Sequence, residues 1–416
     1  MRDEVREATT ALRQLFGPTP LQRNAHLSAA FEADIYLKRE DLTPVRSYKL
    51  RGAFNFMRKR MAEGGGDRVF ACASAGNHAQ GFAYCCRHFG VEGVVFMPVT
   101  TPQQKIDKTR IFGAGHIRIE LVGDIFDVCY AAAKAFVEEN DGVMVPPFDD
   151  PDIIEGQASV AAEIEAEWPE EGGLPDLIVM PVGGGGLSAG MTGYFNGQLA
   201  DAAFLFAEPA GAPSLRRSLE AGEIVTLDEV DNFVDGAAVA RIGDANFAAL
   251  GRFSPEQVML VPENAICATM TEMLNVEGVV LEPAGALALT ALSMLSPERV
   301  RGRRIVVLVS GGNFDFDRLP DVKERAMRHA GLKKYFILRL PQRPGALKDF
   351  LNLLGPQDDI ARFEYLKKSA RNFGSILIGI ETAKPENFAA LFEKMTESGL
   401  RYQDITENEI LANLII

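Results

Sequence analysis

The sequence predicts an α/β fold of two open parallel-sheet lobes, followed by a small C-terminal α+β domain. Between about residues 45 and 330, short apolar segments alternate with longer helical stretches. Such alternation is typical of a parallel sheet with helices on both faces. The Pro/Asp-rich stretch 146–151 and the turn at 172–175 indicate a second lobe. From residue 335 onward the order becomes β-α-β-β-α-β, which is typical of a ferredoxin-like domain.

The elements of the first region follow from residue type and periodicity. Short apolar runs predict strands, and the longer stretches between them have the spacing of amphipathic helices. The expected strands are Val69–Ala73, Gly93–Met97, His116–Leu121, Leu177–Pro181, Ala203–Ala207 and Ile305–Val309. The expected helices are Ser47–Met61, Asn77–Phe89, Gln103–Phe112, Phe126–Glu139, Glu155–Glu167 and Leu187–Gln198.

The sequence changes character after Asn313. Residues 317–334 are charged and helical, and we expect an exposed connector there. The elements expected beyond it are a strand at 335–340, an amphipathic helix after the turn at 341–345, strands near 362–366 and at 375–380, a helix at 385–397 and a last strand near the C-terminus. We therefore place a domain boundary between residues 330 and 331. The smaller lobe of the first domain should span about residues 50–150.

Composition and charge exclude several classes of function. The chain has 416 residues and a formal net charge of −14, with an isoelectric point near 5.0. This acidity argues against nucleic acid or an anionic membrane surface as the main partner, because both attract basic patches. No apolar run approaches the ~18 residues of a membrane span. The N-terminal segment has no apolar core like that of a signal peptide. We expect a cytoplasmic protein.

Neither cysteines nor histidines predict a structural or catalytic metal. The five cysteines contain no C-x-x-C pair, and reduced thiols are the simplest account of them. The five histidines form no closely spaced ligand pair. We expect no metal site.

Lys49 is the first candidate for chemistry. It stands near the start of an expected helix, with Arg46 and Arg51 on either side and Tyr48 before it. Neighbouring cations and partial burial lower the pKa of an amine, as a nucleophilic lysine requires. The plain alternative is a solvated basic helix face.

The segment Ser74-Ala-Gly-Asn-His-Ala-Gln-Gly81 follows an expected strand and opens an expected helix. Small residues at such a turn allow several backbone amides to converge on one carboxylate or phosphate. An ordinary strand–helix turn capped by Ser74 is the alternative.

The segment Gly183-Gly-Gly-Gly-Leu187 also lies between an expected strand and an expected helix. Successive glycines let the backbone wrap around an oxyanion, so this loop indicates phosphate binding. From Gly184 it also fits G-x-G-x-x-A, and Glu208 ends the next expected strand. This second pattern is typical of dinucleotide binding and keeps an NAD(P)-dependent oxidoreductase open, although Lys49 would then have no role.

From Gly186 the same segment fits G-x-S-x-G, the nucleophile elbow of α/β-hydrolases. An elbow places its serine on the turn, whereas Ser188 is expected inside the helix. The later histidine that a hydrolase needs could only be His329, in the connector. The hydrolase is therefore the weaker alternative.

Ser310-Gly-Gly-Asn313 directly follows the strand expected at 305–309. A hydroxyl at a strand end can meet a ring nitrogen or another buried acceptor. A helix cap with glycine spacing is the alternative.

Together these four motifs resemble the fold-type II pyridoxal-phosphate (PLP) enzymes. Their order and sequence are most similar to the threonine dehydratases, over about residues 15–330. The tail from residue 331 resembles one ACT-like regulatory domain of the isoleucine-controlled biosynthetic form. The catabolic dehydratases usually lack such a tail, and a catabolic serine/threonine dehydratase is the nearest alternative.

The resemblance implies that Lys49 binds PLP covalently. The cofactor's phosphate would lie against Gly183, Gly184, Gly185, Gly186 and the amide of Leu187. Ser310 would face the pyridine nitrogen, and Asn77 would bind the 3′-oxygen of the ring.

The resemblance also implies groups around the substrate and the ring. The carboxylate of the substrate would meet the loop Ser74, Ala75, Gly76, Asn77 and His78. Tyr48 and the residues near Gly236 would flank the ring, and Glu282 would approach its edge.

The implied reaction is β-elimination from L-threonine to 2-oxobutanoate and ammonia, with L-serine as a second substrate. L-Isoleucine is the implied effector, and a dimer or tetramer the implied assembly. Serine racemases of this fold carry Ser where this chain has Ala75, so racemisation should be minor. They also bind a divalent cation through a Glu and an Asp six residues later, and the second position here is Ser214. A non-catalytic amino-acid sensor stays open as a further alternative.

Overall fold

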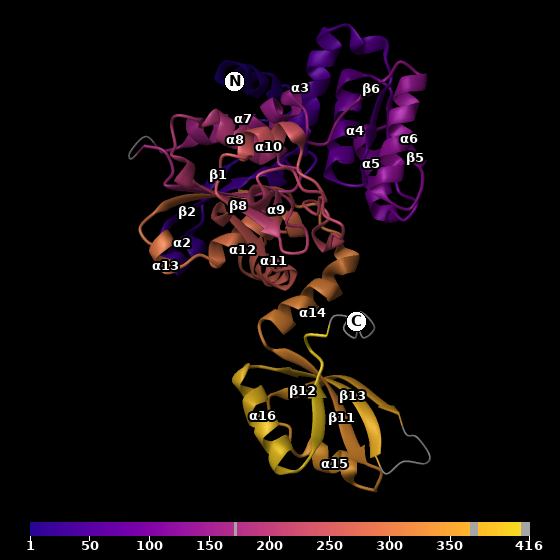
Figure 1. Cartoon of the computed structure of the whole chain (residues 1–416), viewed down its shortest axis with the longest axis vertical. Coiled ribbons are helices and arrows are strands. Elements are labelled where there is room, and N and C mark those ends of the chain that lie inside the picture. The colour runs from indigo at the N-terminus through magenta and orange to yellow at the C-terminus, as the bar shows by residue number, and fades with distance from the viewer. Residues whose placement is uncertain (170–172, 367–372, 409–416) are drawn as a thin grey trace. The chain divides into compact units, whose positions relative to one another are not determined.

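The computed structural model describes residues 1–169, 173–366 and 373–408 (Figure 1). It divides into two compact units. The first comprises residues 1–266 and 273–315, and the second comprises residues 316–416 together with 267–272 of helix α11 (Glu263–Glu277).

A six-stranded sheet forms the larger lobe of the first unit. Its strand order is β1-β2-β10-β7-β8-β9, and every neighbouring pair is parallel except β1 and β2. The strands are β1 (Leu21–Arg23), β2 (Asp34–Arg39), β10 (Arg304–Val309), β7 (Leu177–Pro181), β8 (Phe204–Pro209) and β9 (Val258–Val261).

A four-stranded sheet forms the smaller lobe. Its order is β5-β4-β3-β6, and all of its pairs are parallel. The strands are β5 (Ile117–Leu121), β4 (Gly93–Met97), β3 (Phe70–Ala73) and β6 (Val143–Met144). Two parallel sheets in one unit confirm the predicted fold class.

Helices pack around both sheets and bury an apolar core in the larger lobe and separate apolar clusters in the smaller one. Helix α7 packs against α3 and α8, while α12 packs on β10 and β7. The α-helices are α1 (Arg2–Leu12), α2 (Ala25–Phe31), α3 (Lys49–Ala62), α4 (Asn77–Phe89), α5 (Gln103–Gly113), α6 (Phe126–Glu139), α7 (Pro151–Glu167), α8 (Gly186–Tyr194), α9 (Ser214–Ala221), α10 (Asp244–Leu250), α12 (Pro283–Ser293) and α13 (Pro297–Val300). Short 3₁₀ turns are η1 (Glu40–Leu42), η2 (Gly65–Asp67), η3 (Asp201–Ala203), η4 (Asn232–Val234) and η5 (Pro255–Gln257).

The sequence did not predict β1, β2, β6 or β9, and β2 shows why. It reads DIYLKR, so its charged residues hide the strand pattern. In the structure Lys38 is fully buried and its ammonium lies 2.9 Å from Oε2 of Glu163 on α7. A charge inside a sheet is tolerated when a partner from elsewhere neutralises it, and local sequence does not show that partner.

The C-terminal unit has the ferredoxin-like order predicted for it. Its sheet runs β12-β13-β11-β14 with all neighbours antiparallel. The elements are η6 (Phe316–Arg318), α14 (Leu319–His329), β11 (Lys333–Pro341), α15 (Ala346–Leu351), β12 (Asp358–Leu366), β13 (Phe373–Thr382), α16 (Glu386–Glu397) and β14 (Arg401–Asp404). Phe336, Phe350 and Phe388 lie in its buried core.

Helix α14 was expected to be an exposed connector, and this expectation is wrong. Val322 and Ala326 are buried, and the hydroxyl of Tyr335 donates to Glu324 over 2.9 Å. The helix thus packs within the C-terminal unit. The boundary between residues 330 and 331 stays a prediction, as does the 50–150 limit of the smaller lobe.

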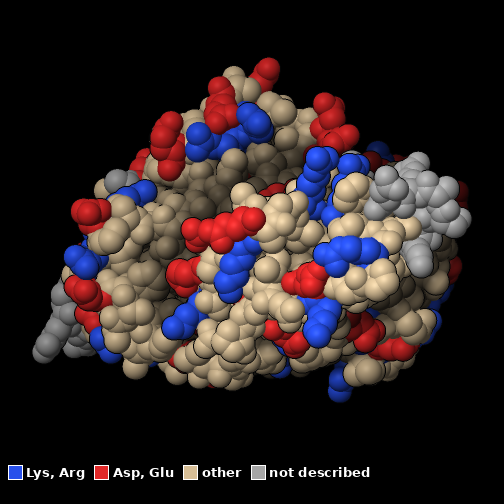
Figure 2. Space-filling model, turned by 90° about the horizontal axis from the view of Figure 1, so that it is seen from below, with Lys and Arg blue, Asp and Glu red and all other residues tan. Residues whose placement is uncertain are grey.

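The surface carries both signs of charge. On the face shown in Figure 2, basic and acidic side chains are interspersed rather than gathered by sign. In the described part of the chain, no helix is both long and apolar enough to cross a membrane. Within these same residues no group of three or more His, Cys, Asp or Glu side chains is placed to hold a metal ion.

Candidate active site

Lys49 begins α3, and the turn before it is held by the segment that follows β10. The amide of Tyr48 donates to the carbonyl of Ser310 over 3.2 Å, and the amide of Gly312 donates to the carbonyl of Arg46 over 2.9 Å. Two of the four predicted motifs are therefore hydrogen-bonded to each other, although they lie far apart in the sequence.

A buried ion cluster fixes the first turn of α3. Arg51 is fully buried, and its guanidinium donates to Glu40 over 2.7 Å and to Glu163 over 2.8 Å. Because Arg51 is neutralised by these two carboxylates, it acts as an anchor for the helix that carries Lys49.

Lys49 lies in a cavity of about 300 Å³. Its ammonium donates to the carbonyl of Pro147 over 2.9 Å, and the rings of Tyr48 and Phe148 lie 5.4 and 5.7 Å away. Burial lowers the pKa of Lys49 to about 8, while the charge of Glu282 acts in the opposite direction. The lowered pKa was expected to come partly from neighbouring arginines. That cause is wrong, because burial produces the shift.

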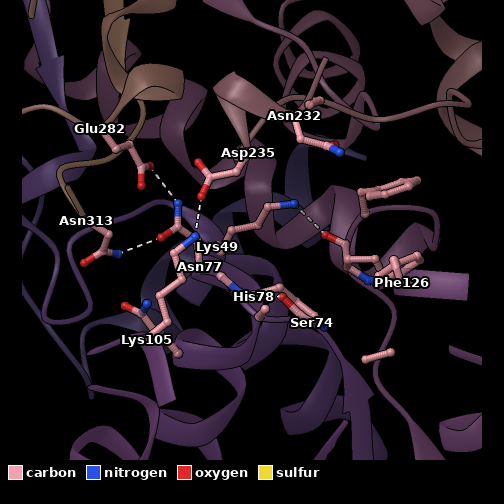
Figure 3. A pocket seen from close by; sticks show the side chains of 18 residues that line it. Lys49, Ser74, Asn77, His78, Lys105, Phe126, Asn232, Asp235, Glu282 and Asn313 are labelled. Atoms are coloured by element: carbon pink, nitrogen blue, oxygen red, sulfur yellow. Dashed lines mark hydrogen bonds and ion pairs between the residues drawn. The ribbon is translucent and has the colours of Figure 1, made fainter. Parts of the chain in front are cut away.

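The cavity brings together the Lys49 motif, the 74–81 loop and residues of the larger lobe (Figure 3). Of the predicted site residues, those that line it are Lys49, Ser74, Ala75, Gly76, Asn77, His78, Gly236 and Glu282. Asn313, the last residue of the fourth motif, lines it as well. Tyr48, Ser310 and the glycine loop do not line this cavity.

His78 is buried beside this cavity and is neutral. Its Nε2 lies 2.9 Å from the carbonyl of Val145, and because that carbonyl only accepts, Nε2 carries the proton. Burial lowers the pKa of His78 to about 3, and the nearby charge of Lys49 adds to the effect. His78 therefore contributes packing and a fixed dipole at neutral pH.

Asn77 and Glu282 meet directly across the cavity. The amide nitrogen of Asn77 donates to Oε1 of Glu282 over 2.7 Å, and Asn313 donates to Oδ1 of Asn77 over 2.7 Å (Figure 3). Burial raises the pKa of Glu282 to about 7, and Asp235 adds to this shift, whereas the hydrogen bond from Asn77 opposes it.

Phe148 lies between the glycine loop and the cavity, which it lines. A Cβ atom on Gly184 would overlap the ring of Phe148, and one on Gly186 would stand 2.9 Å from its carbonyl. Gly185 has a φ of 92° and caps α8. Within the described residues, the amides of 184–188 have no hydrogen-bond acceptor. Free amides at a helix start suit an anion.

Ser310 lies beside the Lys49 turn and is buried. Its hydroxyl donates to the carbonyl of Ala284 over 3.1 Å. The backbone amide of Tyr48 donates to the carbonyl of Ser310. Tyr48 is partly buried, and this burial raises the pKa of its phenol well above the usual range.

Sequence reasoning missed a second set of cavity residues, including Lys105, Phe126, Phe148, Asn232 and Asp235. Lys105 on α5 forms an ion pair with Asp235, which follows η4 (Figure 3). This pair joins segments more than one hundred residues apart, so the sequence around either residue contains no sign of it. The spacing of Lys105 and Lys108 by three was a usable signal, since it places both on one face of the predicted helix.

The two rival readings of the glycine segment find no support in the local geometry. Both oxygens of the Glu208 carboxylate accept amide hydrogens at the start of α9, from Leu215 over 2.7 Å and Arg216 over 2.9 Å. Ser188 is fully buried inside α8 and donates to the carbonyl of Pro181 over 3.3 Å.

Comparisons with known proteins identify the family of the chain. Residues 12–311 match the model of the pyridoxal-phosphate dependent enzyme family. This chain belongs to that family. Residues 324–415 match the C-terminal regulatory domain of threonine dehydratase.

Similar proteins cover nearly the whole chain. The biosynthetic L-threonine dehydratase IlvA of Bacillus subtilis (strain 168) is 45% identical over 399 residues, which are 96% of this chain and 93% of the relative. The processed threonine deaminase isoform 2 from Solanum lycopersicum has a solved structure that is 34% identical, with a TM-score of 0.71 over 78% of this chain and 94% of its own. A second solved structure, the T.th. threonine deaminase, is 31% identical, with a TM-score of 0.68 over 76% and 98%.

The residues present fit the PLP cofactor of this family. A buried amine with a lowered pKa stands at one end of the site. Behind Phe148, which lines the cavity, a loop whose glycines leave no room for a Cβ carries free amides. An amine for the cofactor's aldehyde and amides for its phosphate are the donor set that PLP requires.

The lowered pKa of Lys49 predicts a pH dependence of stability in the cofactor-free protein. Between about pH 8 and pH 10.5 the unfolded chain binds a proton on this amine that the folded chain does not, so the free energy of unfolding rises with pH. Relative to Lys49→Met, the gain across this window should be about 3 kcal/mol. Urea unfolding of both proteins at several pH values measures it, and parallel profiles would contradict the assignment.

Proposed function

We propose that this PLP enzyme is an L-threonine dehydratase, which converts L-threonine to 2-oxobutanoate and ammonia. The observation that carries the proposal is the buried Lys49 amine in a cavity faced by the 74–81 loop. The similarity to biosynthetic threonine dehydratases over 96% of the chain identifies the substrate.

Lys49 is the residue that would bind the cofactor and then move the proton. An amine with a pKa of about 8 is partly free at neutral pH, so it can act first as a nucleophile and then as a base for the proton on the α-carbon of the substrate. When bound, PLP supplies a sink for the charge that develops at that carbon. The carbonyl of Pro147, 2.9 Å from Nζ, holds the amine until then.

The loop Ser74–His78 would bind the carboxylate of the substrate. Helix α4 begins at Asn77, so the first amides of the helix point their dipoles toward this loop. Ser74 stiffens it, because its hydroxyl oxygen accepts a hydrogen bond from the amide of Gly76 over 3.1 Å. Gly236 lies on the opposite side, where Ala284 leaves no room for a Cβ. Ala75 offers no hydroxyl as a second acid, so racemisation of the substrate should be minor.

Four further residues would act on the ring of the cofactor. Asn77 would donate to its 3′-oxygen, and Ser310 would offer the ring nitrogen a neutral hydroxyl instead of a carboxylate. A hydroxyl does not hold a proton on that nitrogen, and this favours elimination over transamination. Tyr48 would flank the ring, and Glu282 would lie at its edge.

Gly183, Gly184, Gly185, Gly186 and Leu187 would bind the phosphate, and Gly185 gives the sharpest test. Gly185→Ala puts a side chain at a φ of 92° and 2.6 Å from Ile242, so the free energy of unfolding should fall by about 1–3 kcal/mol. The affinity for PLP should fall as well. Gly197→Ala is the matched control, because Gly197 has a φ of +77° but no atom within 4 Å of the added Cβ. Equal PLP dissociation constants for the two variants would contradict the phosphate role.

Regulation and assembly complete the proposal. The C-terminal unit would bind L-isoleucine as a feedback inhibitor, consistent with the match of residues 324–415 to a threonine dehydratase regulatory domain. We propose a dimer or tetramer in the cytoplasm.

The test is turnover of L-threonine by the purified protein, compared with L-serine and repeated with L-isoleucine. We expect 2-oxobutanoate and ammonia in equal amounts, a lower kcat/KM for serine by about 10- to 200-fold because one methyl contact is lost, and inhibition by isoleucine. A preference for serine without any isoleucine effect would favour the catabolic alternative.

A further inference from the structure

A chain of hydrogen bonds runs from α5 to the centre of the candidate active site. The ammonium of Lys108 donates to Oδ1 of Asn313, Nδ2 of Asn313 donates to Oδ1 of Asn77 over 2.7 Å, and Nδ2 of Asn77 donates to Glu282 over 2.7 Å. Figure 3 shows the last two links side by side. Asn313 belongs to the fourth sequence motif, and no role has yet been given to it.

The direction of this chain is fixed at Asn313. Lys108 can only donate, so it requires the oxygen of the Asn313 amide on its side. The carbonyl of Val45 can only accept, and Nδ2 of Asn313 donates to it over 2.8 Å. Turning the Asn313 amide over would break both contacts. Asn313 must therefore present N–H to Asn77, whose oxygen faces Asn313 and whose nitrogen faces the cavity.

We propose that Asn313 is a positioning residue that compels Asn77 to offer an N–H donor, and not its carbonyl oxygen, to the 3′-oxygen of PLP. The proposal rests on the role given above to Asn77. An amide can rotate to reverse its donor and acceptor with little change in shape, so a site that needs a donor must fix its orientation.

Glu282 cannot fix the orientation of Asn77 by itself. A carboxylate accepts from Asn77, but a protonated carboxyl group can donate to it instead. Since burial raises the pKa of Glu282 to about 7, both forms are present near neutral pH. Asn313 carries no such ambiguity, because it does not titrate.

The test compares Asn313→Asp with the wild-type protein. Aspartate keeps an acceptor for Lys108 but cannot donate to Asn77, so the amide of Asn77 should turn its oxygen toward the 3′-oxygen of PLP. The dissociation constant of PLP, measured by titrating the cofactor-free protein, should rise about tenfold, as expected for the loss of one hydrogen bond. The dissociation constant of 3-deoxypyridoxal phosphate, which lacks that oxygen, should not change. kcat should fall more than KM changes.

Lys105→Met is the matched control for charge. Lys105 stands three residues before Lys108, and the charges of both lysines lower the pKa of Glu282, but Lys105 bonds Asp235 and not Asn313. If the charge of Lys108 acted through space and not through its hydrogen bond to Asn313, Lys105→Met would change cofactor binding in the same way as Lys108→Met. The proposal predicts that only Lys108→Met weakens the binding of PLP more than it weakens the binding of 3-deoxypyridoxal phosphate.

Coupling to Asn77 decides between positioning and a general structural effect. Asn77→Ala should weaken the binding of PLP, and adding Asn313→Asp to this variant should cause no further loss of affinity. Additive losses, or equal effects of Asn313→Asp on both cofactor forms, would overturn the proposal. If Asn313→Asp fails to fold, Lys108→Met and Lys108→Arg test the same chain, with Arg expected to restore binding. If PLP does not attach to Lys49 of the wild-type protein, the proposed function itself is wrong.

Discussion

Lys49→Ala should lose essentially all turnover of L-threonine, by about 10⁴-fold or more, because the proposed mechanism uses this one amine as both nucleophile and base. The loss should appear in kcat, since the 74–81 loop that would bind the substrate carboxylate is untouched. The variant should also lack the visible absorption of the bound cofactor. Steady-state kinetics and an absorption spectrum at equal protein concentration provide the measurement.

The fold should survive this substitution. A buried ammonium whose pKa is lowered by burial destabilises the folded state, so Lys49→Ala without cofactor should unfold no more easily than the cofactor-free wild type at pH 7. Lys59→Ala is the control on the same helix, because Lys59 forms ion pairs with Asp152 and Glu155 away from the cavity. Lys59→Ala should remain coloured and active. A coloured, active Lys49→Ala would remove the basis of the mechanism.

Deleting the C-terminal unit should leave turnover and abolish the response to isoleucine. The solved structure of the T.th. threonine deaminase matches 76% of this chain, which covers 98% of the solved chain. Isoleucine at about 100-fold the concentration that halves the rate of the full chain, a factor near the usual upper range of an allosteric coupling, should leave the rate of the shortened chain unchanged.

The end point of the deletion tests the domain boundary as well. A chain that ends at residue 330 retains α14 but removes β11, exposing the buried Val322 and Ala326. A chain that ends at residue 315 removes both. We expect the shorter chain to be the more soluble, with similar kcat. Inhibition that persists in both chains would show that isoleucine acts outside the C-terminal unit.

Much of the fold could be predicted from the sequence, because the patterns that mark these strands and helices are local. Gly93–Met97, Leu177–Pro181 and Phe126–Glu139 occur as predicted, since apolar runs and helical periodicity mark them directly. The strand Asp34–Arg39 was missed because its buried lysine is neutralised by Glu163 on another element. Helix α14 was misjudged for a similar reason, since its buried face meets a strand that begins after it.

Site residues could be predicted where a motif implies a local shape. They could not be predicted where two segments distant in the sequence meet. The loop at 74–78 and Lys49 could be placed on one cavity from their motifs. The ion pair of Lys105 with Asp235, and Phe148 between the glycine loop and the cavity, depend on tertiary packing. Of the two causes expected for the lowered pKa of Lys49, burial is confirmed and the neighbouring arginines are wrong, because Arg51 is neutralised by partners that the sequence does not place.

Borohydride reduction of the purified protein, followed by peptide mapping, tests the central claim most directly. The account predicts that the cofactor is trapped on a single peptide, at Lys49, with the visible absorption lost in proportion. A pyridoxyl group on any other lysine, or no modified peptide from a protein that turns over threonine, would contradict it.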